Sequence, residues 1–150
     1  RPAPVLRLPE QVPASQVPAT VGGLPTLGME DTTLDYVGFE PQGAYVVAGP
    51  PRSGLSSAVR WLAESLRRTH PSVPLVLLTP RESALASLNL WPAQLTGTAQ
   101  VKDYLQTNLA PYYNSAAQGT TPSVAIFVDR FGELIGSEAD AALTEALKQV

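Results

Sequence analysis

The chain has 150 residues, of which 44% are hydrophobic and 15% are charged, and its formal net charge is −3. This composition is typical of one globular domain with a hydrophobic core and excludes a disordered tail. The mildly acidic balance gives no electrostatic footprint for direct DNA binding. The chain has no cysteine and only one histidine, His70, and this composition excludes disulfides, thiolate metal sites and histidine clusters.

The first segment of the chain is rich in proline. Residues 1–31 contain six prolines (Pro2, Pro4, Pro9, Pro13, Pro18 and Pro25). Because proline fixes φ and has no backbone donor, this segment is not expected to form a helix. We therefore interpret residues 1–31 as a linker or a strap on a domain surface, and residues 32–150 as the domain itself.

Four short apolar runs in the remainder are typical of β-strands. In chain order they cover Leu34–Val37, Ala44–Ala48, Leu75–Leu78 and Val124–Val128. Apolar residues at helical spacing predict three helices, one from about Ser56, one around Val101–Leu109 and one around Leu143–Val150. Apolar strands that alternate with helices indicate a parallel α/β sheet, in which ligands bind beyond the carboxyl ends of the strands.

The loop after the second run resembles a phosphate-binding loop. Its sequence, Gly49-Pro50-Pro51-Arg52-Ser53-Gly54-Leu55-Ser56, matches the pattern G-x-x-x-x-G-K-[ST] except that leucine replaces the lysine. In such loops backbone N–H groups surround a phosphate, the lysine adds a positive charge and the hydroxyl binds Mg²⁺. Arg52 offers a partial replacement for the missing charge. The candidate ATP-binding residues are Gly49, Arg52, Ser53, Gly54, Leu55, Ser56 and Ser57. The same residues are also typical of a turn between strand and helix that binds no ligand.

A carboxylate follows the fourth run. Four or more apolar residues and then an aspartate, here Asp129, describe a Walker B strand, whose aspartate supports Mg²⁺. Ser56 and Asp129 are therefore the candidate metal ligands. The residue that usually activates water is a glutamate directly after the aspartate, but this chain has Arg130 there, and Glu133 has the wrong spacing. Alternatively, Asp129 only caps the turn after the strand.

Together these residues resemble the FtsK/SpoIIIE family of RecA-like ATPases, and most closely the tandem ATPase domains of type VII secretion systems in Gram-positive bacteria. The resemblance covers about Leu24 to the end of the chain. It lies in Leu24–Met29, in the strand Leu34–Val37, in Tyr45–Gly54, in Leu77–Leu85 and in the apolar strand that ends at Asp129.

The resemblance implies a three-layer P-loop (RecA-like) parallel sheet. The family's core has further strands after the Walker B strand, so the fold of residues 32–150 is expected to be C-terminally incomplete, with an unpaired sheet edge. The chain begins with Arg1 rather than methionine, and we therefore expect it to be a piece of a longer protein.

The resemblance also implies a function. The family forms membrane-anchored ring motors, so we expect a place on the cytoplasmic side, membrane attachment through other parts of the full protein, and neighbouring ATPase domains or a secreted protein as partners. The departures at Leu55 and Arg130 favour a degenerate domain for regulation, nucleotide sensing or substrate recognition. Such a domain binds ATP and Mg²⁺ weakly or not at all, has little or no hydrolysis, and has no catalytic residues of its own. Two alternatives remain open: an active ATP-driven DNA or protein translocase domain, and an interaction scaffold without a ligand.

Overall fold

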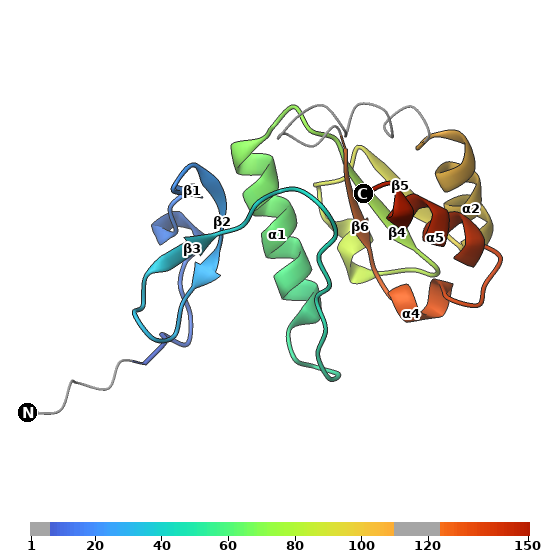
Figure 1. The fold of residues 1–150 in the computed structure, drawn as a ribbon. Helices are drawn as coiled ribbons and strands as arrows, with labels where there is room; N and C mark the ends of the chain where they lie inside the picture. The colour runs from blue at the N-terminus through green and yellow to red at the C-terminus, as the bar shows by residue number, and fades with distance from the viewer. Residues whose placement is uncertain (1–6, 110–123) are drawn as a thin grey trace, which may run out of the picture.

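The computed structural model describes residues 7–109 and 124–150, and its strands form two separate sheets (Figure 1). The first sheet is antiparallel, in the order β1-β2-β3. It consists of β1 (Thr20–Val21), β2 (Leu24–Met29) and β3 (Tyr36–Gly38), and a short 3-10 turn, η1 (Ala14–Gln16), precedes it. Gly22 and Gly23 join β1 to β2 with φ values of 60° and 82°, the positive values that a two-residue hairpin turn requires. Part of the segment interpreted as a linker or strap thus contributes strands to this sheet.

The second sheet is parallel, in the order β5-β4-β6. It consists of β4 (Leu75–Thr79), β5 (Ala93–Thr96) and β6 (Ala125–Val128), and a short 3-10 helix, η2 (Ala84–Ser87), lies between β4 and β5 in the chain. Every residue of the central strand β4 is buried. The strands predicted at Leu75–Leu78 and Val124–Val128 are confirmed. Continuous apolar runs are typical of parallel strands that are covered by helices on both faces.

Helices lie on both faces of the parallel sheet (Figure 1). They are α1 (Leu55–Thr69), α2 (Thr98–Thr107), α4 (Phe131–Leu134) and α5 (Asp140–Lys148). Helix α1 packs Ala63 and Leu66 against Leu75 on one face, and α2 and α5 pack against Val76 and Leu78 on the opposite face. The three helices predicted from apolar spacing therefore form, within a few residues of the expected positions.

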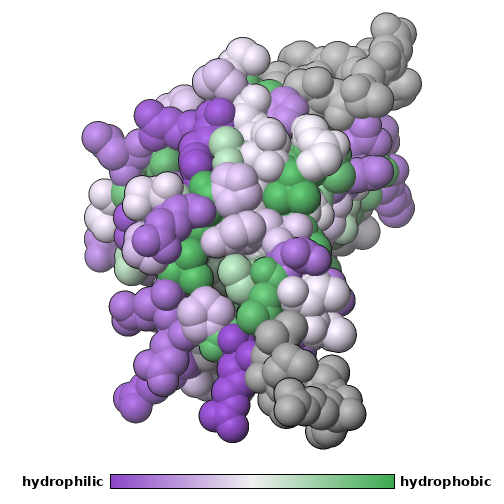
Figure 2. Space-filling model, turned by 90° about the vertical axis from the view of Figure 1, so that its left-hand side faces the viewer, coloured by the Kyte–Doolittle hydropathy of each residue, from purple (hydrophilic) through white to green (hydrophobic). Residues whose placement is uncertain are grey.

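Helix α1 also holds the antiparallel sheet, through side chains that donate to backbone carbonyls. The Ser65 hydroxyl donates to the carbonyl oxygen of Thr26 at 2.7 Å, and the Trp61 indole N–H donates to that of Leu27 at 2.9 Å. Arg68 reaches the carbonyl of Val17 at 3.2 Å. The outer side of this sheet, seen in Figure 2, is mainly polar with small apolar areas. One helix thus joins the two sheets.

The prediction of a three-layer, RecA-like parallel sheet is wrong. The described strands form a small parallel sheet and a separate antiparallel one, and the expected strand Ala44–Ala48 is exposed coil, with 91% of Val46 accessible to solvent. An apolar run becomes a buried strand only where another strand pairs with it, and no described strand pairs with residues 44–48. The strand expected at Leu34–Val37 begins later, at Tyr36, because Leu34 has a φ of 58°.

In the two described ranges, no helix combines the length and the apolar character that crossing a membrane requires.

Candidate functional site

The glycine-rich loop before α1 folds tightly on itself. A Cβ atom on Gly49 would stand 2.5 Å from the Ser53 hydroxyl oxygen, so a larger residue there would require the Ser53 side chain to move. The N–H of Ser53 donates to the carbonyl of Pro50 at 3.2 Å, and Arg52 and Gly54 have positive φ values of 64° and 89°. The loop residues from Gly49 to Gly54 are exposed. The loop is therefore a compact turn at the surface.

The start of α1 carries the remaining candidate residues. Gly54 caps the helix without a side-chain hydrogen bond, and the N–H of Ala58 closes the first turn on the carbonyl of Gly54 at 2.9 Å. The amides of Leu55, Ser56 and Ser57 precede that bond, so they lack helical acceptors and lie at the positive end of the helix dipole. Ser56 and Ser57 are exposed, whereas Leu55 is half-buried. The helix start can attract an anion, but Leu55 supplies no charge to hold one.

Asp129 lies at the carboxyl end of β6, as expected. Its N–H donates to the carbonyl of Leu78 at 3.0 Å, which extends the parallel ladder by one residue. Its carboxylate accepts a hydrogen bond from the hydroxyl of Ser83, a residue that also caps η2 by accepting from the N–H of Leu85 at 3.2 Å. One oxygen of the Asp129 carboxylate is thus engaged with the loop that follows β4.

Two arginines contact the carboxylate of Glu133, which follows Asp129 by four residues. Arg81 contacts Glu133 through two parallel hydrogen bonds, of 3.0 Å from Nε to Oε2 and 2.9 Å from Nη2 to Oε1. Arg130 approaches the same carboxylate at 3.7 Å. The hydrogen bond from Arg81 lowers the pKa of Glu133 below its ordinary value, and the same bond raises the pKa of Arg81. Glu133 is therefore an ionised partner of arginines.

The structure does not bring the two predicted halves of the site together. Figure 1 shows the loop at the foot of α1 well apart from the start of α4, which follows β6 and Asp129. Across residues 7–109 and 124–150, no hydrogen bond or ion pair joins residues 49–57 to Asp129, and no group of three or more acidic, histidine or cysteine side chains could hold a metal. Ser56 and Asp129 share no contact, because residues 44–48 do not form the strand that would carry the loop to the sheet edge.

Sequence reasoning missed Ser83 and Arg81 as site residues. Both follow the carboxyl end of β4, where Thr79 is buried and its hydroxyl donates to the carbonyl of Arg81 at 2.6 Å. The rule that polar residues after parallel strands share one edge would have identified them, since β4 and β6 are neighbours.

The chain was also compared with protein-family models, with curated proteins and with solved structures, and none of them matches it.

Proposed function

We propose that this chain is a degenerate FtsK/SpoIIIE-type ATPase domain of a type VII-like secretion motor, which senses nucleotide or recognises substrate without hydrolysing ATP. The observation that carries the proposal is the half-buried Leu55 as the first residue of α1. It occupies the place of a phosphate-binding lysine, directly after a tight glycine-rich loop, and leaves a helix start that has amide donors but no cation.

The residues that follow β6 support the absence of hydrolysis. Phosphoryl transfer depends on charge stabilisation and on a residue that orients the attacking water. Arg130 stands directly after Asp129, and the nearby Glu133 is held by Arg81 at 2.9 Å. A carboxylate whose pKa is lowered by such a partner is a poor acceptor of a proton from water. Arg130 carries no basic group, and the contact with Arg81 makes Glu133 a weaker base than a free glutamate.

The proposal assigns the remaining chemistry to weak binding. ATP phosphates would contact the amides of Leu55, Ser56 and Ser57 and the guanidinium of Arg52, and Mg²⁺ would bind through the nucleotide more than through Ser56 or Asp129. The partners are neighbouring ATPase domains and a secreted protein. The domain works on the cytoplasmic side of a membrane-anchored protein, whose other parts contact the membrane.

Calorimetric titration of this chain with MgATP, combined with a phosphate-release assay, tests the proposal. We expect weak binding and no phosphate release. Leu55→Lys should tighten MgATP binding by about 10- to 150-fold, because one charge-assisted hydrogen bond contributes about 1.5–3 kcal/mol. Leu55→Met is the matched control, since it keeps the volume without the charge, and its affinity should not change.

Two outcomes would refute the proposal. Phosphate release that disappears in Asp129→Asn would identify an active translocase ATPase. A chain that does not bind MgATP, either unmodified or as Leu55→Lys, would be a scaffold without a nucleotide site.

A further inference from the structure

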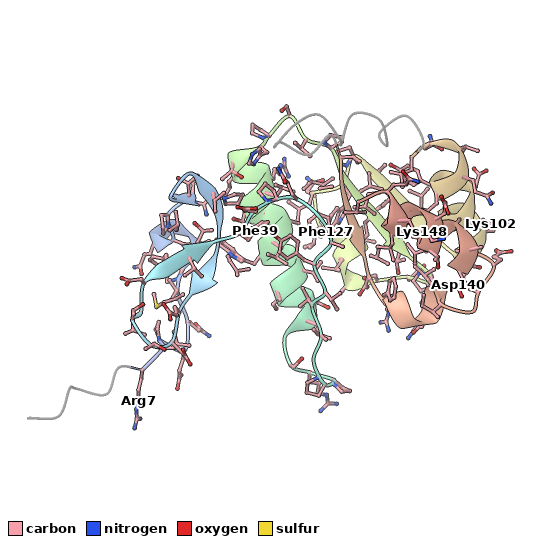
Figure 3. All side chains as sticks on the ribbon, viewed as in Figure 1. Arg7, Phe39, Lys102, Phe127, Asp140 and Lys148 are labelled. Carbon is pink, nitrogen blue, oxygen red and sulfur yellow. The ribbon has the colours of Figure 1, made fainter. Side chains whose placement is uncertain are left out.

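The connection between the antiparallel sheet and α1 contains neither a helix nor a strand. The N–H of Phe39 donates to the carbonyl of Pro25 at 2.9 Å, so pairing within the sheet ends at Phe39, which Figure 3 labels. The chain then continues as coil past α1 to the foot of that helix, which begins at Leu55 (Figure 1). Residues 42–54 are all exposed. The two sheets are therefore joined along the chain by an exposed connection.

The centre of this connection makes few contacts. Residues 44–48, hereafter the apolar segment, read Ala-Tyr-Val-Val-Ala. Tyr45 is 57%, Val46 91% and Val47 39% exposed. Within the described part of the chain, the segment takes part in one hydrogen bond, from the Tyr45 hydroxyl to the carbonyl of Glu40, and its own main chain takes part in none. Exposed backbone with so few contacts is a preferred site of proteolytic cleavage.

The sequence of the connection favours one peptide bond for cleavage. Proline has no N–H and a fixed φ, so bonds next to proline are poor substrates for most endopeptidases. Residues 42–49 contain no proline, whereas proline flanks them on both sides. In this stretch the apolar side chains larger than alanine are Tyr45, Val46 and Val47, and Val46 is the most exposed of them. An endopeptidase that selects an aliphatic residue after the cut therefore finds its best substrate at Tyr45–Val46.

We propose that the Tyr45–Val46 bond is an endoproteolytic processing site, and that the N-terminal piece stays bound to α1 after cleavage until dilution releases it. Water adds across the amide and the C–N bond breaks, so Tyr45 gains a carboxylate and Val46 gains an ammonium group. The catalyst is an endopeptidase with a pocket for an aliphatic side chain. The products are residues 1–45 and residues 46–150. This processing does not depend on nucleotide binding.

Contacts with α1 hold the N-terminal piece. Pro25 and Thr26 of β2 are fully buried. The carbonyls of Thr26 and Leu27 accept hydrogen bonds from Ser65 and Trp61 of α1, at 2.7 Å and 2.9 Å. The donors and the acceptors lie on opposite sides of the cut, and none of them belongs to the connection. The antiparallel sheet can therefore stay in place when the connection is broken.

The same contacts allow release, because the antiparallel sheet shares no apolar core with the rest of the molecule. None of residues 7–45 belongs to either apolar core cluster of the described chain. In the intact chain the connection keeps the sheet near α1 at an effective concentration on the order of 1 mM. Cleavage removes this constraint, so the association depends on the protein concentration. Release uncovers the face of α1 that carries Trp61, Ser65 and Arg68.

Brief digestion of the unmodified chain with thermolysin, a neutral protease that cuts before large aliphatic residues, tests the processing site. Mass spectrometry should identify residues 1–45 and 46–150 as the first pair of complementary fragments. Cleavage within a described strand or helix before residues 42–49 are cut would overturn the site.

Two double variants test which side chains direct the cut. Val46→Ser with Val47→Ser should slow cleavage of the apolar segment about tenfold or more, because the aliphatic side chains that fill the protease pocket are lost. Ala44→Ser with Ala48→Ser is the matched control, since it introduces the same two serines in the same segment and keeps both valines. It should be cut at the rate of the unmodified chain. Equal rates for the two double variants would also overturn the site.

Size-exclusion chromatography of the cleaved chain tests retention and release. The two pieces should elute together at about 100 µM and apart at about 1 µM, a range below the effective concentration in the intact chain. Ser65→Ala should raise the concentration needed for half association by about 5- to 30-fold, because it removes one buried hydrogen bond. Ser57→Ala, at an exposed position of α1, should not change it. Separation at the higher concentration would overturn retention by α1, and joint elution at the lower one would overturn the release.

Discussion

Replacing Ser65 by alanine tests how α1 holds the antiparallel sheet. The Ser65 side chain is 1% exposed, and its hydroxyl donates to the carbonyl of Thr26 at 2.7 Å. Ser65→Ala removes that donor without adding volume, and it leaves a buried carbonyl with one partner fewer. The change therefore isolates one hydrogen bond between the helix and the sheet.

Two effects of opposite sign set the magnitude. An orphaned buried acceptor costs about 1–3 kcal/mol. Alanine in a helix interior is better than serine by about 0.5 kcal/mol. The hydrogen bond prevails, and we expect a net loss of about 1–2 kcal/mol in the free energy of unfolding. For a chain of this length each kcal/mol moves Tm by about 2–4 °C, so Tm should fall by about 2–8 °C.

Urea unfolding and thermal melting of Ser65→Ala should be compared with those of Ser57→Ala. Ser57 lies on the same helix but is exposed, so that variant keeps only the propensity gain of about 0.5 kcal/mol. Hydrogen exchange at β2 should accelerate in Ser65→Ala alone. Equal stability of the two variants would show that the Ser65 contact contributes nothing, and would refute this account of how the sheets are joined.

Two further predictions concern the carboxylate cluster and the antiparallel sheet. The hydrogen bond from Arg81 lowers the pKa of Glu133. The ion pair therefore stabilises the folded chain fully at pH values above 4.5, the ordinary pKa of glutamate, and this stabilisation is lost as the pH falls through the lowered pKa. The Tm difference between the unmodified chain and Glu133→Gln should thus be largest at neutral pH and vanish in acid; a constant difference would contradict this. Gly38→Ala should lower the free energy of unfolding, measured by urea unfolding, by about 1–3 kcal/mol, because the new Cβ would lie 2.8 Å from the Leu24 Cβ. Gly28→Ala, whose Cβ would meet nothing within 4 Å, is the control, and an equal loss in both would contradict the clash.

The elements that could be predicted are those whose signal is local. The apolar run of β4 and the helical spacing in α1 are properties of consecutive residues, and both elements form where expected. Residues 44–48 carry an equally strong local signal, but a strand also needs a partner, which depends on residues far along the chain. Strand β5 was missed for the opposite reason, since Ala93–Thr96 is short and half polar, and it forms because β4 pairs with it.

The candidate site divides in the same way. A carboxylate after an apolar strand is visible in the sequence, and Asp129 stands where it was expected. Its contact with Ser83 spans 46 positions and that of Arg81 with Glu133 spans 52, so both follow from strand order rather than from any motif. The loop motif at Gly49–Ser56 describes local shape only, and the sequence could not fix which part of the molecule the loop faces.

The hydrogen bonds between α1 and the segment that contains the antiparallel sheet affect how the chain can evolve. Ser65, Trp61 and Arg68 all donate to main-chain carbonyls, which every amino acid possesses. Substitutions among the outward-facing residues of the sheet therefore leave these hydrogen bonds intact, whereas a change at any of the three donors removes one of them. Sequence drift should accumulate on the strands and be purged from one face of the helix, so that related chains would look alike along α1 long after their sheets had diverged.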